Sequence, residues 1–443
     1  MSEASRISMS ADHLGYIKGG PSVTAESLEI TNRLLQKNHD ELHIFFRDMN
    51  GHNHLVHNLF TRLSLGATPD QLQTAYDDDA PLQREIPRLD EKVVERLADD
   101  DYFAERITKI THYNNFRVFF EQQIDKKGWQ QVVNDYVFSK SPIAEAILPL
   151  MYDGAYHSII HLGLGAEFAQ PAVIAEALAQ AAAHDSFDTN WFFHISEKLA
   201  QHNADDGVGK SLLQLAREAA AHPAIREAAR TPDLIGTMKQ KRAIYPKAGD
   251  KIVTLAAQFR VRPEELEEKT AEMIAFCAYL AGAAQRPGKA TKIDFFFMHC
   301  VTSSLFISVL VDQDWISTED KVRLVEWKGR LDLIWYITCG LPELSTESIT
   351  GYNVGPERDW DQLYQLVNEQ HDDGHVAKFV RALKNGEDLD RKLGDEFTSA
   401  VHGDMWLKIA RMAYDTTLGL PAPAKWVLMA GMDSAWASVP GQA

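Results

Sequence analysis

The chain has 443 residues, of which 45 % are hydrophobic, and its 45 basic and 63 acidic side chains give a formal net charge of −18. This apolar content allows a sizeable core, and the negative charge repels phosphate backbones and anionic lipid surfaces, which argues against nucleic acid as a partner. The three cysteines are too few, and odd in number, to form a disulfide framework, so we expect a reducing compartment.

The N-terminus lacks the apolar core of a signal peptide, and no stretch offers the roughly 18 uninterrupted apolar residues of a membrane span. The most apolar segment, residues 295–311, is interrupted by His299, Thr302, Ser303 and Ser304. We therefore expect a cytoplasmic protein that does not enter a membrane.

Helical patterns follow a loose N-terminal arm, residues 1–22. The first helix begins after Thr24, and an apolar stripe near residues 55–66 follows three histidines, His52, His54 and His57. His57 shares a helical face with Phe60, so it is the one of the three predicted to point inward. The alternative, which base rates favour for the trio, is a helix start whose histidines cap the helix or face water.

Further helices are expected on both sides of an acidic surface excursion, residues 77–101. Proline at the first helical position predicts a new helix from Pro69, and helical patterns dominate from residue 102 to 152. The segment 201–250 is rich in glycine and proline, but it still contains helical patterns, which favours short connecting helices over a linker. We expect a single helical catalytic domain over residues 23–443.

The stretch 152–170 carries His157 and His161 in an apolar setting. Residues four apart share one face of a helix, so two imidazoles can reach the same point, and Glu167 could add a carboxylate. A hydrogen-bonded core pair is the alternative to a metal site. The alanine-rich segment 171–184 predicts a helix that packs closely beside this one.

The C-terminal half adds three more candidate residues on apolar helices. His299 lies in the buried helix predicted over 294–311, where Ser303 or a metal could satisfy its ring nitrogens. His375 and Lys378 lie three residues apart in a helix that follows the turn-rich segment 341–362, although a lysine in such a run usually extends its amine to water.

The chain has no GxGxxG in a strand-turn-helix context and no GxxxxGK[ST], GxSxG or CxxC motif. What remains is histidine on apolar helices, and neutral imidazole suits iron, zinc, copper or nickel. The sequence therefore predicts an all-α protein, a compact multi-helix fold that encloses a buried metal site.

Four segments resemble blocks of the questin oxidase family, enzymes of fungal aromatic polyketide pathways. They read GHNHLVHNLFTRLSLGATPDQLQ, YHSIIHLGLGAEF, DFFFMHCVTSSLF and GHVAKFVRAL, and they extend from Gly51 to Leu383. The resemblance implies oxidative opening of the central ring of an anthraquinone, a Baeyer-Villiger-like outcome with dioxygen as the oxidant.

Carried over by position, the resemblance implies a metal site with an expected ligand set and expected catalytic residues. Four neutral imidazoles leave a buried dication uncompensated, which favours an anionic further ligand. Glu167 could supply it, or Lys378 could do so as a carbamate after losing its proton and taking up carbon dioxide. The expected ligands are His57, His157, His161, His299 and Lys378, with His375 in reserve, and His157 and Lys378 are also expected to be catalytic.

The expected cofactor is Fe(II), which would activate dioxygen beside a small aromatic polyketide substrate. Phe295, Phe296, Tyr156 and Trp335 could line a pocket for a planar substrate, although ordinary core positions are the more common role of such residues. Two alternatives stay open: an NADPH-dependent, metal-free oxidase in which histidines act as acid and base, and a non-catalytic helical carrier of aromatic polyketides.

Overall fold

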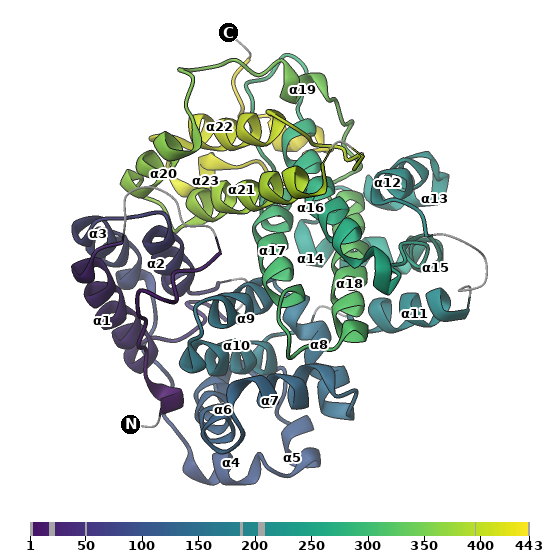
Figure 1. Cartoon of the computed structure of the whole chain (residues 1–443). Coiled ribbons are helices and arrows are strands. Elements are labelled where there is room, and N and C mark those ends of the chain that lie inside the picture. Colours follow the sequence, from purple (N-terminus) through teal and green to yellow (C-terminus); the bar gives the residue numbers. More distant parts are fainter. Residues whose placement is uncertain are drawn as a thin grey trace. The chain divides into compact units, whose positions relative to one another are not determined.

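The computed structural model describes residues 3–16, 23–48, 51–186, 189–202, 209–394 and 396–441. Within these ranges the regular secondary structure is helical, with isolated β-bridges and no strand (Figure 1). This confirms the predicted all-α fold. The predicted arm, residues 1–22, lies partly outside the described ranges.

The chain forms two compact units, each described here by itself. Unit 1 comprises Met1–Thr189, Asp312–Ile316 and Tyr364–Lys378. Its helices are α1 (Ala25–Glu41), α2 (Leu55–Ser64), α3 (Pro69–Asp79), α4 (Glu91–Arg96), α5 (Asp100–Ala104), α6 (Tyr113–Lys127), α7 (Trp129–Val133), α8 (Pro142–Tyr152), α9 (His157–Glu167) and α10 (Pro171–Ala183), with the second half of α20 (Trp360–Glu369) and the first turn of α21 (His375–Leu393).

Unit 2 comprises Asn190–Val311, Ser317–Leu363 and Phe379–Ala443. Its helices are nearly all of α11 (Thr189–His202), then α12 (Leu212–Ala221), α13 (Pro223–Ala229), α14 (Gly236–Lys239), α15 (Tyr245–Ala256), α16 (Leu266–Ala283), α17 (Phe295–Val311), α18 (Thr318–Thr338) and α19 (Glu347–Thr350), the rest of α20 and α21, α22 (Met405–Thr417) and α23 (Ala422–Lys425). The segment 201–250 thus contains the short helices that the sequence predicts, and α17 matches the predicted buried helix. The single catalytic domain expected over 23–443 stays a prediction.

Helix α10 is the centre of unit 1. It packs against both α6 and α9, and every residue from Ala172 to Ala183 is buried. Seven of these twelve residues are alanines, and their small side chains allow neighbouring helices to approach closely. At the contact with α9, a Cβ added to Gly165 would lie 2.8 Å from Cδ1 and 3.0 Å from the backbone nitrogen of Ile174. Glycine at 165 is therefore needed for the spacing of these two helices.

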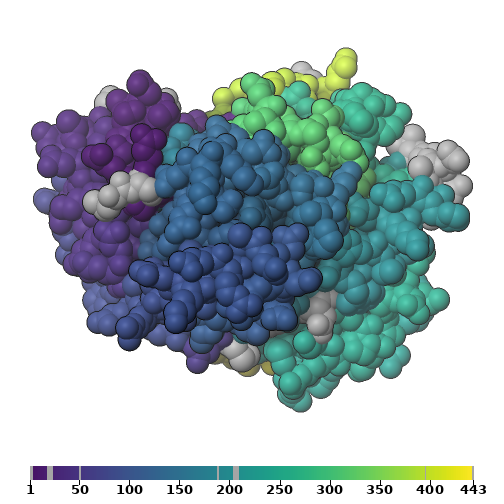
Figure 2. Space-filling view, turned by 90° about the horizontal axis from the view of Figure 1, so that it is seen from below, coloured from purple at the N-terminus to yellow at the C-terminus, as the bar shows by residue number. Residues whose placement is uncertain are grey.

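The segment coloured blue, which contains α4 to α8, faces the viewer in Figure 2 and forms part of the outer surface of unit 1. Its helices present charged residues to solvent, as the exposed Lys126 and Lys127 at the end of α6 show. The segment 77–101, which the sequence predicts to be an acidic surface excursion, contains the end of α3 and the short helix α4.

Three consecutive residues before α9 adopt the left-handed conformation: Gly154 with φ 60°, Ala155 with φ 55° and Tyr156 with φ 69°. This conformation costs roughly 1–2 kcal/mol per residue for side chains other than glycine. A Cβ at Gly154 would lie 2.1 Å from Nε2 of His184, so glycine is needed there for space as well as for its φ angle. Such strain is concentrated at functional sites, and here it immediately precedes His157.

A buried arginine holds the late segment 368–375 onto α2. Arg62 donates to the Asn58 side chain at 2.6 Å and to the backbone carbonyls of Asn368 and Gln370. Asn58 in turn donates to the carbonyl of Asp372 at 3.1 Å. These bonds join two stretches that lie about 310 residues apart in sequence and place the start of α21 beside the start of α2.

We expect Gly165→Ala to lower the thermal unfolding midpoint by a few degrees, because overpacking of a close helix contact costs about 1–3 kcal/mol. Calorimetry or fluorescence-monitored melting measures the change. Shortening the contacting side chain in a Gly165→Ala, Ile174→Val double variant should restore part of the loss. An unchanged midpoint in the single variant would contradict the close approach of α9 and α10.

Candidate metal centre and its histidine cluster

Three histidines from distant parts of unit 1 converge at helix starts. His54 is the residue before α2, His157 is the first residue of α9, and His375 is the first residue of α21. One ring nitrogen of each lies within 4.8 Å of the corresponding nitrogens of the other two, and His157 and His375 are buried. A group of this kind could hold a metal ion.

Each of these rings has its Nδ1 atom against a hydrogen-bond acceptor. His54 Nδ1 lies 3.1 Å from Asp373 Oδ2, and His375 Nδ1 lies 2.6 Å from Asp373 Oδ1. His157 Nδ1 lies 2.5 Å from the carbonyl of Gly154, the residue that begins the left-handed turn. A neutral ring that donates through Nδ1 has a bare lone pair on Nε2, which is the usual arrangement of metal-binding histidines and the acceptors that orient them.

The Nε2 atoms of His54 and His157 lie only 2.8 Å apart. If both rings were neutral, two bare lone pairs would face each other at this distance, because both Nδ1 atoms already carry the protons. A cation must therefore lie between the two rings, either a metal ion bound by both or a proton that they share.

The electrostatics favour a neutral His54 and an ionised Asp373. Burial, and then the charge of Lys378, lower the pKa of His54 to about 4. Burial alone would raise the pKa of Asp373, but His375 and His54 hold it well below its usual value. The carboxylate thus stays charged and fixes the orientation of two imidazoles. It also supplies one negative charge close to the cation.

Lys378 lies one turn into α21, three residues after His375. Its side chain is buried, and Nζ has no hydrogen-bond partner among the described residues. Burial lowers the pKa of Lys378 to about 8, against the opposing effect of Asp373. The Lys378 amine therefore does not extend to water, as a lysine in an apolar run usually does. It can lose its proton near neutral pH, and it lies beside the histidines. Whether Lys378 binds a metal stays a prediction.

His57 and His161, two of the expected ligands, contact each other instead of joining the group above. His57 Nε2 lies 3.2 Å from His161 Nδ1, and His161 Nε2 lies 2.7 Å from a carboxylate oxygen of Glu176 on α10. Both histidines are fully buried. The structure thus brings His57, His157 and His161 into one cluster, while His161 has both nitrogens engaged by protein groups.

The reading of the 52–57 histidines as a solvated helix start is wrong. His52 and His57 are buried, and the side chain of His54 is 11 % exposed. The His52 ring stacks on His157 with 3.9 Å between centroids, and its Nε2 lies 2.9 Å from Nε2 of His184. All three histidines therefore pack inward, and the inward direction predicted for His57 is confirmed.

Two other candidate ligands, His299 and Glu167, are not among the three grouped histidines. His299 is buried on α17 in unit 2, where its Nδ1 donates to the carbonyl of Phe295 at 2.8 Å. Glu167 is the last residue of α9, ten residues and thus roughly 15 Å of helix from His157, and it accepts a hydrogen bond from the backbone of Tyr16. Their roles as ligands stay predictions.

The sequence analysis did not find four residues that hydrogen-bond to the clustered histidines or to their partners. Asp373 contacts His54 and His375, and Glu176 contacts His161. His39 contacts Glu176 and Glu121. The signal for Glu176 is a single charged residue within the apolar helix PAVIAEALAQAAA, since an acid is almost never fully buried unless it is paired. His54 lies just before its helix, where the helical spacing that predicts His57 to point inward gives no direction.

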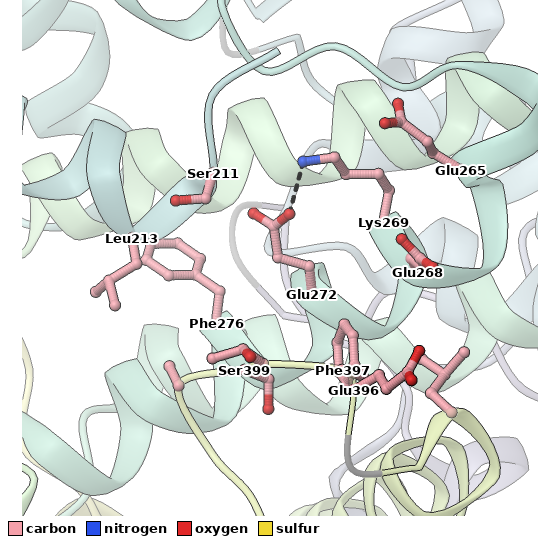
Figure 3. A pocket seen from close by; sticks show the side chains of 13 residues that line it. Ser211, Leu213, Glu265, Glu268, Lys269, Glu272, Phe276, Glu396, Phe397 and Ser399 are labelled. Carbon is pink, nitrogen blue, oxygen red and sulfur yellow. Dashed lines mark hydrogen bonds and ion pairs between the residues drawn. The ribbon is translucent and has the colours of Figure 1, made fainter. Parts of the chain in front are cut away.

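A pocket of about 620 Å³ lies in unit 2, between the start of α16 and residues 393–400 (Figure 3). Four glutamates line it, and one of them, Glu272, pairs with Lys269 at 2.7 Å. Its walls include Phe276 and Phe397 but none of the clustered histidines. The acidic lining disfavours phenolate or carboxylate ligands, so this pocket is a poor candidate for a site that acts on phenols.

Among the described residues, no helix combines the length and the apolar character that crossing a membrane requires.

Residues 51–383 match the model of the family described as questin oxidase-like. Similar proteins include "Baeyer-Villiger oxidase GME11358" of Pestalotiopsis microspora, 68 % identical over 99 % of this chain and 100 % of that protein. The "Baeyer-Villiger oxidase mdpL" of Emericella nidulans is 57 % identical over 98 % of each chain, and a "Questin oxidase" of Aspergillus fumigatus is 43 % identical over 99 % of this chain and 100 % of its own length.

The matched region contains His54, His157, His375, Lys378 and Asp373, so the whole candidate centre lies within it. The family match confirms the resemblance of the four sequence blocks. The relatives are named as oxidases, which does not support the alternative of a non-catalytic carrier. The chain belongs to the questin oxidase-like family of oxidative enzymes.

Proposed function

We propose that the chain uses dioxygen to cleave the central ring of an anthraquinone-type aromatic polyketide, and that the reaction takes place at the histidine cluster of unit 1. The observation that carries this proposal is the group of His54, His157 and His375, which offer one ring nitrogen each within 4.8 Å of one another, with Asp373 behind two of the rings and a buried amine, Lys378, beside them. The names of the relatives, Baeyer-Villiger oxidase and questin oxidase, support the reaction class. A cytoplasmic location and small-molecule partners are part of the proposal.

The electron balance defines the form of the substrate. Insertion of one atom of dioxygen beside a ring carbonyl leaves the second atom to be reduced to water, which takes two electrons and two protons. A hydroquinone-type substrate supplies both electrons and both protons itself as it reaches the quinone level, whereas a quinone substrate needs NADPH as the electron donor. Hydrolysis of the resulting lactone then opens the ring.

Iron(II) is the first candidate for the cation. The residues that would hold it are His54, His157 and His375, with Lys378 as a further ligand if it carries a carbamate. Bound there, iron would supply activation of dioxygen and orientation of the substrate. The donor set fits this assignment, since all three rings already have acceptors for their Nδ1 protons. In this proposal His157 and Lys378 keep the catalytic roles expected from the sequence.

A shared proton is the second candidate, and one observation favours it: 2.8 Å between Nε2 atoms is an ordinary hydrogen-bond distance. In that case the imidazoles and Lys378 would act as acid and base. Removal of a proton from a hydroquinone hydroxyl makes the ring more electron-rich, and an electron-rich ring reacts more readily with dioxygen. Both candidates use the same residues.

The iron hypothesis predicts about one iron per chain in the purified protein and loss of oxygen consumption after chelation. Elemental analysis and an oxygen electrode measure the two. Asp373→Asn should weaken metal binding about 10–100-fold, because it removes the charge behind His54 and His375, whereas the exposed Asp361→Asn should have no effect. Metal-free protein that stays active after chelation would contradict iron and support the shared proton.

The neutral form of the Lys378 amine is needed both for a carbamate and for proton removal. The neutral fraction rises as pH passes upward through the pKa, so the rate should rise through about pH 8, far below the ordinary lysine value of about 10.4. Lys378→Met should abolish this rise and lower the rate about 100-fold or more. Lys392→Met on the exposed end of α21 is the control.

If the rate of the wild-type protein does not change between pH 7 and pH 9, the role given to Lys378 is wrong. Removal of bicarbonate separates the two uses of the amine, because only a carbamate depends on carbon dioxide.

A further inference from the structure

A second set of buried groups runs from the cluster through α9 and α10 toward α1 and α6. His57 contacts His161 at 3.2 Å, and His161 contacts Glu176 Oε2 at 2.7 Å. The other carboxylate oxygen, Glu176 Oε1, lies 2.6 Å from Nδ1 of His39. Figure 1 shows α9 and α10 side by side, so His161 and Glu176 meet where these helices pack.

Glu176 is ionised although it is fully buried. Burial alone would raise its pKa, but hydrogen bonds from His161 and His39 lower it to about 2. On the far side, His39 Nε2 lies 3.1 Å from Glu121 and 2.6 Å from Arg117, and these two residues pair with each other at 2.7 Å. An ionised carboxylate only accepts hydrogen bonds, so both imidazoles that face Glu176 must donate to it.

This acceptor fixes the tautomers of two histidines in succession. His161 donates through Nε2 to Glu176, so a His161 ring that carries a single proton has a bare Nδ1. That bare atom can only accept, so His57 must donate to it through Nε2. The neutral His57 ring is then left with a bare Nδ1, and this atom is buried with no hydrogen-bond partner among the described residues.

The surroundings of His57 keep it neutral and directed at the cluster. Burial, followed by the charge of Lys378, holds the pKa of His57 well below its ordinary value. His161, His54 and His52 face it as well, and each disfavours a second proton on the ring. A buried acceptor without a partner is destabilising, and a ligand that donates a hydrogen bond to it would remove this cost.

We propose that Glu176, acting through His161, is a positioning residue that holds His57 in the tautomer whose Nδ1 accepts a hydrogen bond from a hydroxyl group of the aromatic substrate. This inference rests on the proposed function, because a hydroquinone-type substrate is the donor. It adds a substrate contact that uses neither the three-histidine group nor Lys378.

The tautomers are measured directly by nitrogen-15 NMR of histidine-labelled protein, with assignments from His57→Gln and His161→Gln. If the protein contains iron, zinc takes its place for these spectra. We expect Nδ1 of His57 and Nδ1 of His161 to be unprotonated in the wild-type protein. Under anaerobic conditions, addition of an anthrahydroquinone should shift the His57 Nδ1 resonance. A protonated His57 Nδ1, or no shift at saturation, would overturn the inference without any variant of Glu176.

Glu176→Gln tests the role of the carboxylate, because an amide can donate to His161 and reverse both tautomers. We expect the NMR pattern to reverse and kcat/KM to fall about 100-fold or more. Glu197→Gln is the matched control: Glu197 accepts from Arg323 at 2.8 Å in unit 2, and its loss should leave kcat/KM within about twofold. Unchanged tautomers or unchanged kcat/KM in Glu176→Gln would overturn the positioning role.

The two proposals fail in different ways. If wild-type protein consumes no dioxygen with an anthrahydroquinone, the proposed function is wrong and the substrate contact falls with it. If it consumes dioxygen but His57 carries its proton on Nδ1, only the role of Glu176 and His57 is wrong.

Discussion

The site depends on one constraint: three imidazoles carry their protons on Nδ1, where each ring has a hydrogen-bond acceptor. Asp373 accepts hydrogen bonds from Nδ1 of His54 and of His375, and the Gly154 carbonyl accepts one from Nδ1 of His157. The Nε2 atoms of His54 and His157 then face each other 2.8 Å apart, and a ring nitrogen of His375 lies within 4.8 Å of a nitrogen of each of these two rings. Such an arrangement is stable only around a cation. The chemistry of the site follows from the identity of that cation, a metal ion or a proton.

The rest of unit 1 maintains this arrangement. The left-handed turn at residues 154–156 aims a carbonyl at His157, and Arg62 fixes the 368–375 segment beside α2. By bonding to the backbone of Asn368, Gln370 and Asp372, Arg62 and Asn58 help to hold Asp373 in register with His54. The close contact of α9 with α10, made possible by Gly165, brings Glu176 to His161. Local strain and tight packing thus serve the orientation of a few ring nitrogens.

Helical periodicity predicted the fold class and the main helices, because apolar residues at helical spacing report burial directly. The pairing of His157 with His161 followed from the same spacing, and the structure does place both in the cluster. The sequence could not show that His161 uses both nitrogens on His57 and Glu176, since this depends on how α2, α9 and α10 pack. It also could not show that the loop before α21 brings Asp373 to His54, about 319 residues away. His54 lies before its helix, where periodicity gives no direction.

A high-resolution crystal structure of the protein as purified, with anomalous scattering data, tests the central claim most directly. The account predicts the Nε2 atoms of His54, His157 and His375 around one point. They should surround either an anomalous peak about 2.0–2.2 Å from each nitrogen or, without metal, a contact shorter than about 3 Å between His54 and His157. Rings whose Nε2 atoms point apart to separate water molecules would contradict it.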